Sequence, residues 1–225
     1  MAVTKWIGRL LTGPGWRVAE QAEAQPRAPL TYPAQVTLAD TSVTLRLLED
    51  GDRNAILKFA SQLPTHDLLF LRRDITQPDQ VDHWLRDAAE GLATTVFALR
   101  GSEIVGYATV ASDGLTWTRH VRELRVLVGP AMRGKNLGRL LTEQAFAIAK
   151  QQGVRKMIAQ MTTDQEAAIK VFKEMGFEPE ARMRNQVIDR DGTLHDLLIM
   201  GLDVDAFQGK LDAALLSAQQ SFMNT

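Results

Sequence analysis

The segment from Val126 to Leu141 reads VLVGPAMRGKNLGRLL and changes character twice. It starts as an apolar, β-branched run, passes through a basic loop that contains Gly134 and Gly138, and ends in an amphipathic helix. Backbone N–H groups at a helix N-terminus have no partners within the helix, and the positive end of the helix dipole lies behind them. Such a turn binds anions without help from side chains. The segment therefore predicts a strand, a phosphate-binding turn and a helix in direct succession.

The loop and the helix after it are well specified by their residues. Asn136 is the non-glycine residue type that best tolerates a positive φ, and the glycines on either side allow a ligand to approach the backbone closely. Gly153 can end the helix. The apolar residues of the helix fall on one face, at Leu137, Leu140, Leu141, Ala145 and Ile148.

Several interpretations of this loop compete. The run from Gly129 to Lys135 matches the GxxxxGK pattern of nucleoside triphosphatases. Asn136, however, lacks the hydroxyl that would bind magnesium, and Pro130 removes a backbone donor. The match is therefore incomplete. An ordinary strand-to-helix turn with solubilising Arg and Lys side chains is the plainest alternative.

The residues from Arg133 to Gly138, RGKNLG, resemble the pyrophosphate loop of the GNAT N-acetyltransferase superfamily. That motif is Arg or Gln, two residues, Gly, one residue, then Gly or Ala, and Asn136 departs from it at the first glycine. The preceding HVRELRVLVGP is similar to the family's fourth strand, and DQEAAIKVFKEMGF is similar to a later helix and its Gly-Phe ending. The stretch from Arg184 to Met200 is similar to the paired last strands of bacterial members. The resemblance covers about Val43 to Asp203.

This resemblance implies an α/β (α+β) fold with a mixed, mostly antiparallel sheet flanked by helices and one parallel strand pair around the cofactor helix. It implies acetyl-CoA as co-substrate, without a metal. In this family the strand before the loop is splayed or bulged from its parallel neighbour, so that its backbone meets the pantetheine arm and the thioester. The cofactor-binding residues expected from the resemblance are Val126, Leu127, Val128, Arg133, Gly134, Lys135, Asn136, Leu137, Gly138, Arg139 and Phe172.

Residue patterns predict the remaining elements in order. The first half contains a strand from Val43 to Leu48, a helix that Asp52 caps and that runs to Leu63, a helix from Gln80 to Glu90, and two strands within 94–110 joined at Gly101-Ser102. The second half contains a strand from Val121 to Val128 and, after the helix described above, a strand from Arg155 to Met161. A helix opened by a Thr163–Glu166 capping box and ended by Gly176 follows, and then paired strands with a turn at Asp191-Gly192.

Three regions are expected along the chain. Residues 1–40 contain four prolines and show no sustained period, which predicts a peripheral extension. Residues 41–203 form the acetyltransferase domain. Residues 204–225 carry an apolar stripe from Phe207 to Phe222 at helical spacing, which predicts an amphipathic helix. This stripe packs either on its own domain or against a second subunit in a homodimer.

Composition excludes several classes of protein. A net charge of −1 argues against a nucleic-acid binder, which needs a surplus of Lys and Arg. The absence of cysteine removes disulfides, thiolate metal sites and a cysteine acyl-enzyme. The only apolar stretch near the N-terminus, WIGRLL, contains Arg9 and is too short for a signal peptide or a membrane span. We therefore expect a cytoplasmic protein that is not integral to a membrane.

Acetyl transfer to an amine needs a base, because an amine with a pKa of about 10 arrives protonated at neutral pH. Glu123 is the candidate, at the position on the strand before the loop where many family members carry a glutamate. Strand alternation puts Glu123, Arg125 and Leu127 on one side and Leu124, Val126 and Val128 on the other. The alternative is a structural Glu–Arg pair on an open strand face.

The general acid is the weak point of the catalytic interpretation. Phe172 stands where family members often place a tyrosine that protonates the leaving thiolate, and Gln165 stands where an Asn is common. These two departures keep open a second function, a coenzyme A-binding sensor or interaction module that has lost catalysis. Tyr107 is expected in the core.

The acceptor is less constrained than the cofactor. We expect a small-molecule or peptide amine that enters over the Arg182 to His195 side, where His195 either lines the acceptor cleft or is structural. The four histidines show no ligand spacing, so no metal site is expected.

Overall fold

The computed structural model describes residues 30–38, 41–69, 71, 73–189 and 191–209. The described residues up to Val204 form one large compact unit, which contains the whole sheet. The N-terminal segment up to residue 29 and most of the expected helix from Asp205 to Phe222 lie outside the described residues. No helix in the described ranges is both long enough and apolar enough to cross a membrane.

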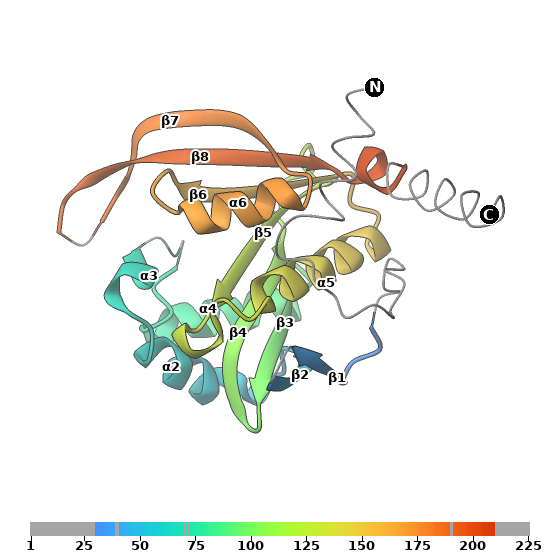
Figure 1. The fold of residues 1–225 in the computed structure, drawn as a ribbon, viewed down its shortest axis with the longest axis vertical. Coiled ribbons are helices and arrows are strands. Elements are labelled where there is room, and N and C mark those ends of the chain that lie inside the picture. Colours follow the sequence, from blue (N-terminus) through green and yellow to red (C-terminus); the bar gives the residue numbers. More distant parts are fainter. Residues whose placement is uncertain (1–29, 39–40, 70, 72, 190, 210–225) are drawn as a thin grey trace, which may run out of the picture. The chain divides into compact units, whose positions relative to one another are not determined.

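The large unit is built on one eight-stranded sheet with the strand order β1-β2-β3-β4-β5-β6-β8-β7. All neighbouring strands are antiparallel except β5 and β6, which are parallel (Figure 1). This topology confirms the predicted fold class. The strands are β1 (Ala34–Leu38), β2 (Thr41–Leu47), β3 (Ala93–Arg100), β4 (Glu103–Ala111), β5 (Val121–Val128), β6 (Lys156–Thr162), β7 (Glu178–Ile188) and β8 (Leu194–Asp203).

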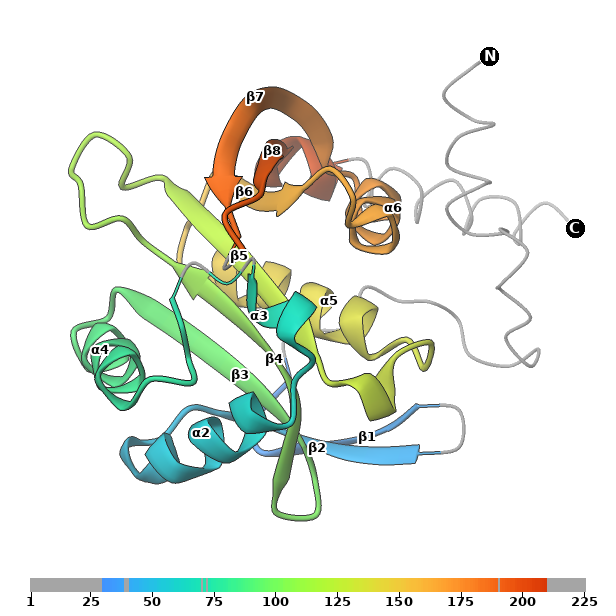
Figure 2. The ribbon, with the colours of Figure 1, turned by 90° about the vertical axis from the view of Figure 1, so that its left-hand side faces the viewer.

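Helices cover both faces of the sheet. Helices α2 and α4 lie on one face and α5 lies on the other, while α6 lies beside β6 and the long curved hairpin of β7 and β8 (Figures 1 and 2). The helices are α2 (Arg53–Ser61), α3 (Thr65–Leu69), α4 (Pro78–Ala89), α5 (Leu137–Gln151) and α6 (Glu166–Glu174), with 3-10 turns at η1 (Asp50–Asp52) and η2 (Pro130–Met132).

An aromatic cluster forms the core between the sheet and helices α2 and α4. Trp84 and Tyr107 have ring centroids 4.9 Å apart, and Phe59 and Phe97 meet Tyr107 edge-on. Such arrangements are favourable because the positive edge of one ring meets the negative face of another. Tyr107 is 5% exposed, which confirms its predicted place in the core. Leu127 of β5 packs against the same cluster.

Helix α5 packs against the opposite face over Gly106 of β4. A Cβ at this position would lie 2.9 Å from the backbone oxygen of Leu127 and 3.3 Å from methyl carbons of Leu137 and Leu141. Both leucines are fully buried in a close-packed core, so their side chains cannot easily move away from such a Cβ. The absence of a side chain at Gly106 therefore lets the N-terminal turns of α5 sit directly on β4 and β5.

Strands β5 and β6 separate soon after they meet. Their parallel ladder covers Val121–Glu123 of β5 and Lys156–Ile158 of β6. Beyond it β5 continues to pair with β4, and β6 continues to pair with β8. The sheet therefore opens between β5 and β6, and this is the splay that the family resemblance implied. The β4–β5 register runs without a shift, so β5 is splayed and not bulged.

Local details differ from the sequence-based expectations at three places. The sheet begins before residue 41, because Ala34–Leu38 form edge strand β1 against β2. Asp52 stands at the N-cap of α2 as predicted, but its side chain makes no cap hydrogen bond, because Arg46 and the backbone N–H of Glu49 occupy its carboxylate. Helix α6 has Gln165 at its N-cap without a side-chain cap, so the predicted Thr163–Glu166 capping box is wrong.

We expect Gly106→Ala to lower the free energy of unfolding by about 1–3 kcal/mol, because the new methyl group overpacks the contact of β4 with β5 and α5. Gly51→Ala is the matched control, since a Cβ at Gly51 meets nothing within 4 Å. Urea denaturation of both variants measures the difference. Equal stability of the two variants would contradict the close contact described above.

Candidate functional site

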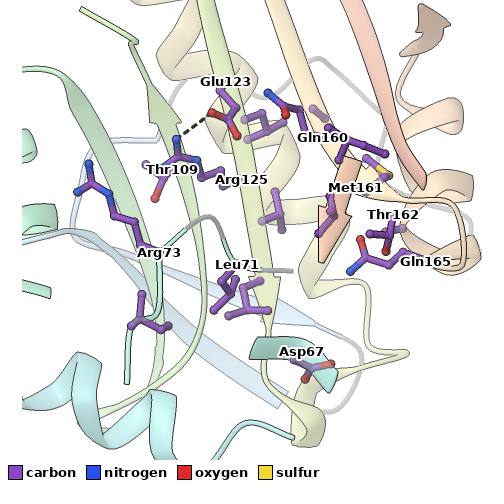
Figure 3. Close-up of a pocket in the computed structure, with 18 of the residues that line it drawn as sticks. Asp67, Leu71, Arg73, Thr109, Glu123, Arg125, Gln160, Met161, Thr162 and Gln165 are labelled. Atoms are coloured by element: carbon purple, nitrogen blue, oxygen red, sulfur yellow. Dashed lines mark hydrogen bonds and ion pairs between the residues drawn. The ribbon is translucent and has the colours of Figure 1, made fainter. Parts of the chain in front are cut away.

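A cavity of about 490 Å³ opens where β5 and β6 separate (Figure 3). Its walls come from both sides of β5, because Glu123, Arg125 and Leu127 line it together with Leu124 and Val126. The cavity therefore passes between the strands from one face of the sheet towards the other. The remaining lining residues come from 67–93, from β4, from β6 and α6, and from the β7–β8 hairpin: Asp67, Leu71, Arg73, Ile75, Trp84, Asp87, Ala93, Tyr107, Thr109, Ala159, Gln160, Met161, Thr162, Gln165, Ala168, Phe172, Gln186, Val187, Ile188 and Leu197.

Glu123 and Arg125 form an ion pair in the wall of this cavity. The Nη2 of Arg125 donates to Oε2 of Glu123 at 2.8 Å, as the dashed line in Figure 3 shows. The Glu123 side chain is 11% exposed and that of Arg125 is 30% exposed. The Nε of Arg125 is buried and has no hydrogen-bond partner. The pair is therefore covered on most sides and yet reaches the cavity.

The β4–β5 register shows which way these side chains point. Thr109 of β4 lies opposite Arg125, and Ala111 lies opposite Glu123, so each pair shares a face of the sheet. Glu123, Arg125 and Leu127 thus lie on the face covered by α2 and α4, as strand alternation predicted. The Glu–Arg pair named as the structural alternative is present, but the face on which it lies is not open.

Every second residue of β5 directs its backbone N–H away from β4, towards the opening between β5 and β6. The N–H of Gly129 donates to the carbonyl of Val105, which makes the opposed residues 105 and 129 a hydrogen-bonded pair. In an antiparallel ladder such pairs alternate with non-bonded ones, so Leu127 is directed to β4, whereas Val126 and Val128 direct their N–H groups to the opposite edge. That edge faces β6 beyond their last residue pair. Val126 and Val128 are therefore the backbone donors at the opening.

The turn before α5 adopts the backbone that the sequence predicted. Gly134 has φ +71° and Asn136 has φ 63°, both in the left-handed region. Asn136 is the N-cap residue of α5, and no side chain caps the first turn of the helix. Leu137 is completely buried, so it anchors the first turn of the helix in the core. The turn thus presents main-chain N–H groups at the N-terminus of a fifteen-residue helix.

The three basic side chains of the turn already have partners on the protein. Arg133 pairs with Asp67 of α3, and Asp67 lines the cavity. The Nζ of Lys135 lies 3.2 Å from Oγ1 of Thr41, and the Nε of Arg139 lies 3.1 Å from Oε1 of Glu143.

The structure separates the expected cofactor residues into two groups. Val126, Leu127 and Phe172 line the cavity together with Glu123, whereas the turn residues and Val128 do not. The two groups meet at the end of β5, because a Cβ at Gly138 would lie 3.6 Å from Cγ2 of Val128. The turn residues that lie outside the cavity are Arg133, Gly134, Lys135, Asn136, Leu137, Gly138 and Arg139.

The wall formed by β6, α6 and the turn between them carries both apolar and neutral polar side chains. Phe172 is buried and meets Phe177 edge-on at 5.0 Å. Gln165 and Thr162 also line the cavity, and the buried Oγ1 of Thr162 has no hydrogen-bond partner. No tyrosine hydroxyl is therefore available at position 172.

The sequence alone assigned no site residue in the wall contributed by residues 67–87. Arg73 pairs with Asp87 of α4 at 2.7 Å, and both side chains line the cavity with Asp67. This segment lies far from the turn motif in sequence and carries no motif of its own. The signal that could have found it is the charge pattern of Asp67, Arg73 and Asp87 just before and within a predicted helix.

Two other residues can now be placed. Burial raises the pKa of the Tyr107 phenol well above its usual value, so the phenol remains protonated at neutral pH. His195 is not among the cavity-lining residues, and its Nε2 lies 2.8 Å from Oδ2 of Asp189. His195 thus lies beside Asp189 and outside this cavity. In the described part of the chain, no group of three or more His, Asp or Glu side chains could hold a metal ion.

Comparison with known proteins identifies the family. The sequence profile of the acetyltransferase (GNAT) family matches residues 59–177, more than half of the 225 residues. An L-methionine sulfoximine/L-methionine sulfone acetyltransferase from Salmonella typhimurium is 28% identical over 168 residues, which cover 72% of this chain and 95% of that protein.

Solved structures of similar fold include yncA from Salmonella typhimurium with its cofactor acetyl-CoA, with a TM-score of 0.63 and 24% identity over 72% of this chain and 94% of that one. Another is spermidine N-acetyltransferase from Vibrio cholerae in complex with CoA and spermine, with a TM-score of 0.63 and 15% identity over 74% of this chain and 98% of that one.

The family match runs from the end of α2 through α6 and thus includes β5, β6, the turn and most of the cavity-lining residues. The chain therefore belongs to the GNAT family of acetyltransferases, which confirms the predicted enzyme class, an N-acetyltransferase with acetyl-CoA as its co-substrate.

Proposed function

We propose that this chain transfers the acetyl group of acetyl-CoA to a primary amine by direct attack, with Glu123 as the base. The observation that carries the proposal is the place of Glu123, whose carboxylate lines the cavity at the last residue pair before β5 and β6 separate. In this place one carboxylate can face both a thioester in the splay and an amine in the cavity.

The cofactor is held mainly by backbone groups. The turn from Arg133 to Gly138 binds the pyrophosphate with N–H groups at the N-terminus of α5. The pantetheine arm then follows β5, where Val126 and Val128 direct their N–H groups towards the splay. These donors suit the amide groups of the arm and the thioester carbonyl, because developing negative charge on that oxygen is stabilised by fixed N–H dipoles.

The reaction removes two protons from the ammonium group and expels the sulfur of coenzyme A from the acyl group. Glu123 takes the first proton from the ammonium directly or through a water molecule, and the amine nitrogen then attacks the carbonyl carbon. The C–N bond forms, the second N–H proton passes to solvent, and the C–S bond breaks to release coenzyme A. A thiol with a pKa of about 8.5 is a fair leaving group, and solvent protonates its thiolate.

Phe172 has no proton to give, so the leaving group is not protonated from that position. Phe172 instead forms an apolar wall beside Gln165. These two residues motivated the alternative of a coenzyme A-binding sensor. The relatives described above are named for acetyl transfer, so the sensor is not favoured.

Acetyl-CoA should raise the melting temperature by about 5–10 °C at a concentration 100 times its Kd, because a ligand at that concentration stabilises by about 2.7 kcal/mol. Mg-ATP should give no such shift. Gly138→Val should abolish the acetyl-CoA shift, since its branched side chain occupies the approach to the turn. Gly138→Ala is the matched control, because its Cβ makes only an ordinary contact with Val128 and the motif accepts alanine. Equal stabilisation by ATP would contradict the proposed ligand.

Glu123→Gln should lower kcat/KM by about 10²- to 10⁴-fold at neutral pH, because the base is lost, and should leave the thermal shift by acetyl-CoA intact. The defect should shrink as the pH approaches the amine pKa of about 10, where free amine needs no base. Glu103→Gln is the control, because Glu103 lies outside the cavity and pairs with Lys58. A pH–rate profile identical to that of the wild type would remove Glu123 from the mechanism.

A further inference from the structure

Arg125 is a partly buried cation in the wall of the cavity. It is two residues beyond Glu123 on the same face of β5, past the last β5–β6 residue pair. Its guanidinium therefore lies in the opened part of the sheet, beside the place proposed for the amine. Figure 3 shows Arg125 and Glu123 side by side in the cavity wall.

The guanidinium of Arg125 is only partly satisfied. It pairs with one carboxylate in the described chain, that of Glu123, and its Nε is buried without a partner. A guanidinium carries five N–H donors in a planar fork that matches a carboxylate with two parallel hydrogen bonds. A buried donor without a partner is unfavourable by about 1–3 kcal/mol. The Arg125 side chain is also 30% exposed and lines the cavity, so its outer N–H groups can receive a further anionic acceptor of hydrogen bonds from the cavity.

The surroundings hold Arg125 in place without supplying that anion. Thr109 lies opposite Arg125 on β4 and lines the cavity. Its hydroxyl is tied at 2.9 Å to the hydroxyl of Thr95, which in turn accepts a hydrogen bond from Nε1 of Trp84 at 3.1 Å. This chain of buried hydrogen bonds fixes the strand surface beneath Arg125 with neutral groups only.

We propose that Arg125 binds the carboxylate of the acceptor, and that the acceptor is a small zwitterion of the α-amino acid type. This inference rests on the proposed function. Binding of the acceptor exchanges the Glu123–Arg125 ion pair for two new ion pairs. The acceptor carboxylate pairs with Arg125, and the acceptor ammonium pairs with Glu123. Binding of the correct acceptor thus frees Glu123 to receive the ammonium proton, whereas an amine without a carboxylate leaves Glu123 held by Arg125.

Arg73 is the competing cation in the cavity. Its Nη2 pairs with Oδ2 of Asp87 at 2.7 Å, and both side chains are about one-third exposed. Asp87 belongs to α4, so this ion pair connects the segment before α4 to that helix. Both residues are distant in sequence from Glu123, the proposed base. Arg73 and Asp87 neutralise each other in the absence of an acceptor. Arg73 therefore serves as the matched comparison for Arg125.

The test compares acceptors that differ only in the carboxylate. Thiol release from acetyl-CoA is measured with L-methionine, L-leucine and L-phenylalanine, with their primary amides, and with spermidine. The wild type should prefer each acid over its amide by at least about 100-fold in kcat/KM, because a site built for hydrogen bonds rejects an analogue that cannot make them. Spermidine, which has no carboxylate, should be as poor as the amides.

Arg125→Met should reduce the acid-to-amide ratio to within about tenfold of unity, and Arg125→Lys should restore part of it because the charge remains. Arg73→Met should keep the wild-type ratio. The thermal shift by acetyl-CoA, measured on every variant, shows that the fold and the cofactor site are intact. A merely structural role of Arg125 would lower the rates with acid and amide alike and leave their ratio unchanged.

Three outcomes would overturn this inference. The first is a wild type that acetylates amides or spermidine as well as the amino acids. The second is loss of the preference in Arg73→Met and not in Arg125→Met. Both of these leave the proposed acetyl transfer standing, because thiol release still occurs. The third, no thiol release with any of the acceptors, contradicts the proposed function and removes the inference with it.

Discussion

The shortness of the parallel ladder between β5 and β6 is the constraint on which the site depends. Two parallel strands that remained paired would leave no space between them and would use every N–H on the shared edge. Here the ladder covers only Val121–Glu123 and Lys156–Ile158. The backbone of β5 beyond that point is directed into an opening, and the side chains of Glu123 and Arg125 meet a cavity instead of a neighbouring strand.

The helix that follows β5 connects this opening to an anion site. Helix α5 can lie close to β4 and β5 because Gly106 carries no side chain, and its fully buried Leu137 anchors the first turn. The left-handed backbone at Gly134 and Asn136 then directs the free end of the helix to the same end of β5. One strand thus links a phosphate-binding turn, backbone donors and a carboxylate in the order in which an extended nucleotide thioester would meet them.

The sequence was a good guide to this fold where its pattern was strong and local. Strand β5 and the turn at Gly101-Ser102 lie where alternation and glycine predicted them. Strand β1 and the short α3 were missed, because a five-residue element carries little periodicity. Asp52 occupies the predicted N-cap position, but its side chain does not cap α2, because Arg46 takes the carboxylate. Local propensity does not reveal such competition.

The candidate site likewise combines residues that a local sequence pattern indicates with residues that only the folded chain brings together. Glu123 and the turn could be proposed from the sequence, because both belong to one continuous segment around a recognisable motif. The opposite wall, with Asp67, Arg73 and Asp87, comes from a distant segment, and only folding brings it to the cavity. The ion pair of Glu123 with Arg125 could be anticipated from alternation, but the buried Nε without a partner could not.

A crystal structure of the chain with coenzyme A would show whether the cofactor enters the opening between β5 and β6. We expect the pyrophosphate on the N–H groups at the start of α5, the pantetheine arm between β5 and β6 beside Val126 and Val128, and the sulfur in the cavity near Glu123. Coenzyme A bound elsewhere, or a bound form in which β6 pairs with β5 as far as Val128, would contradict this expectation.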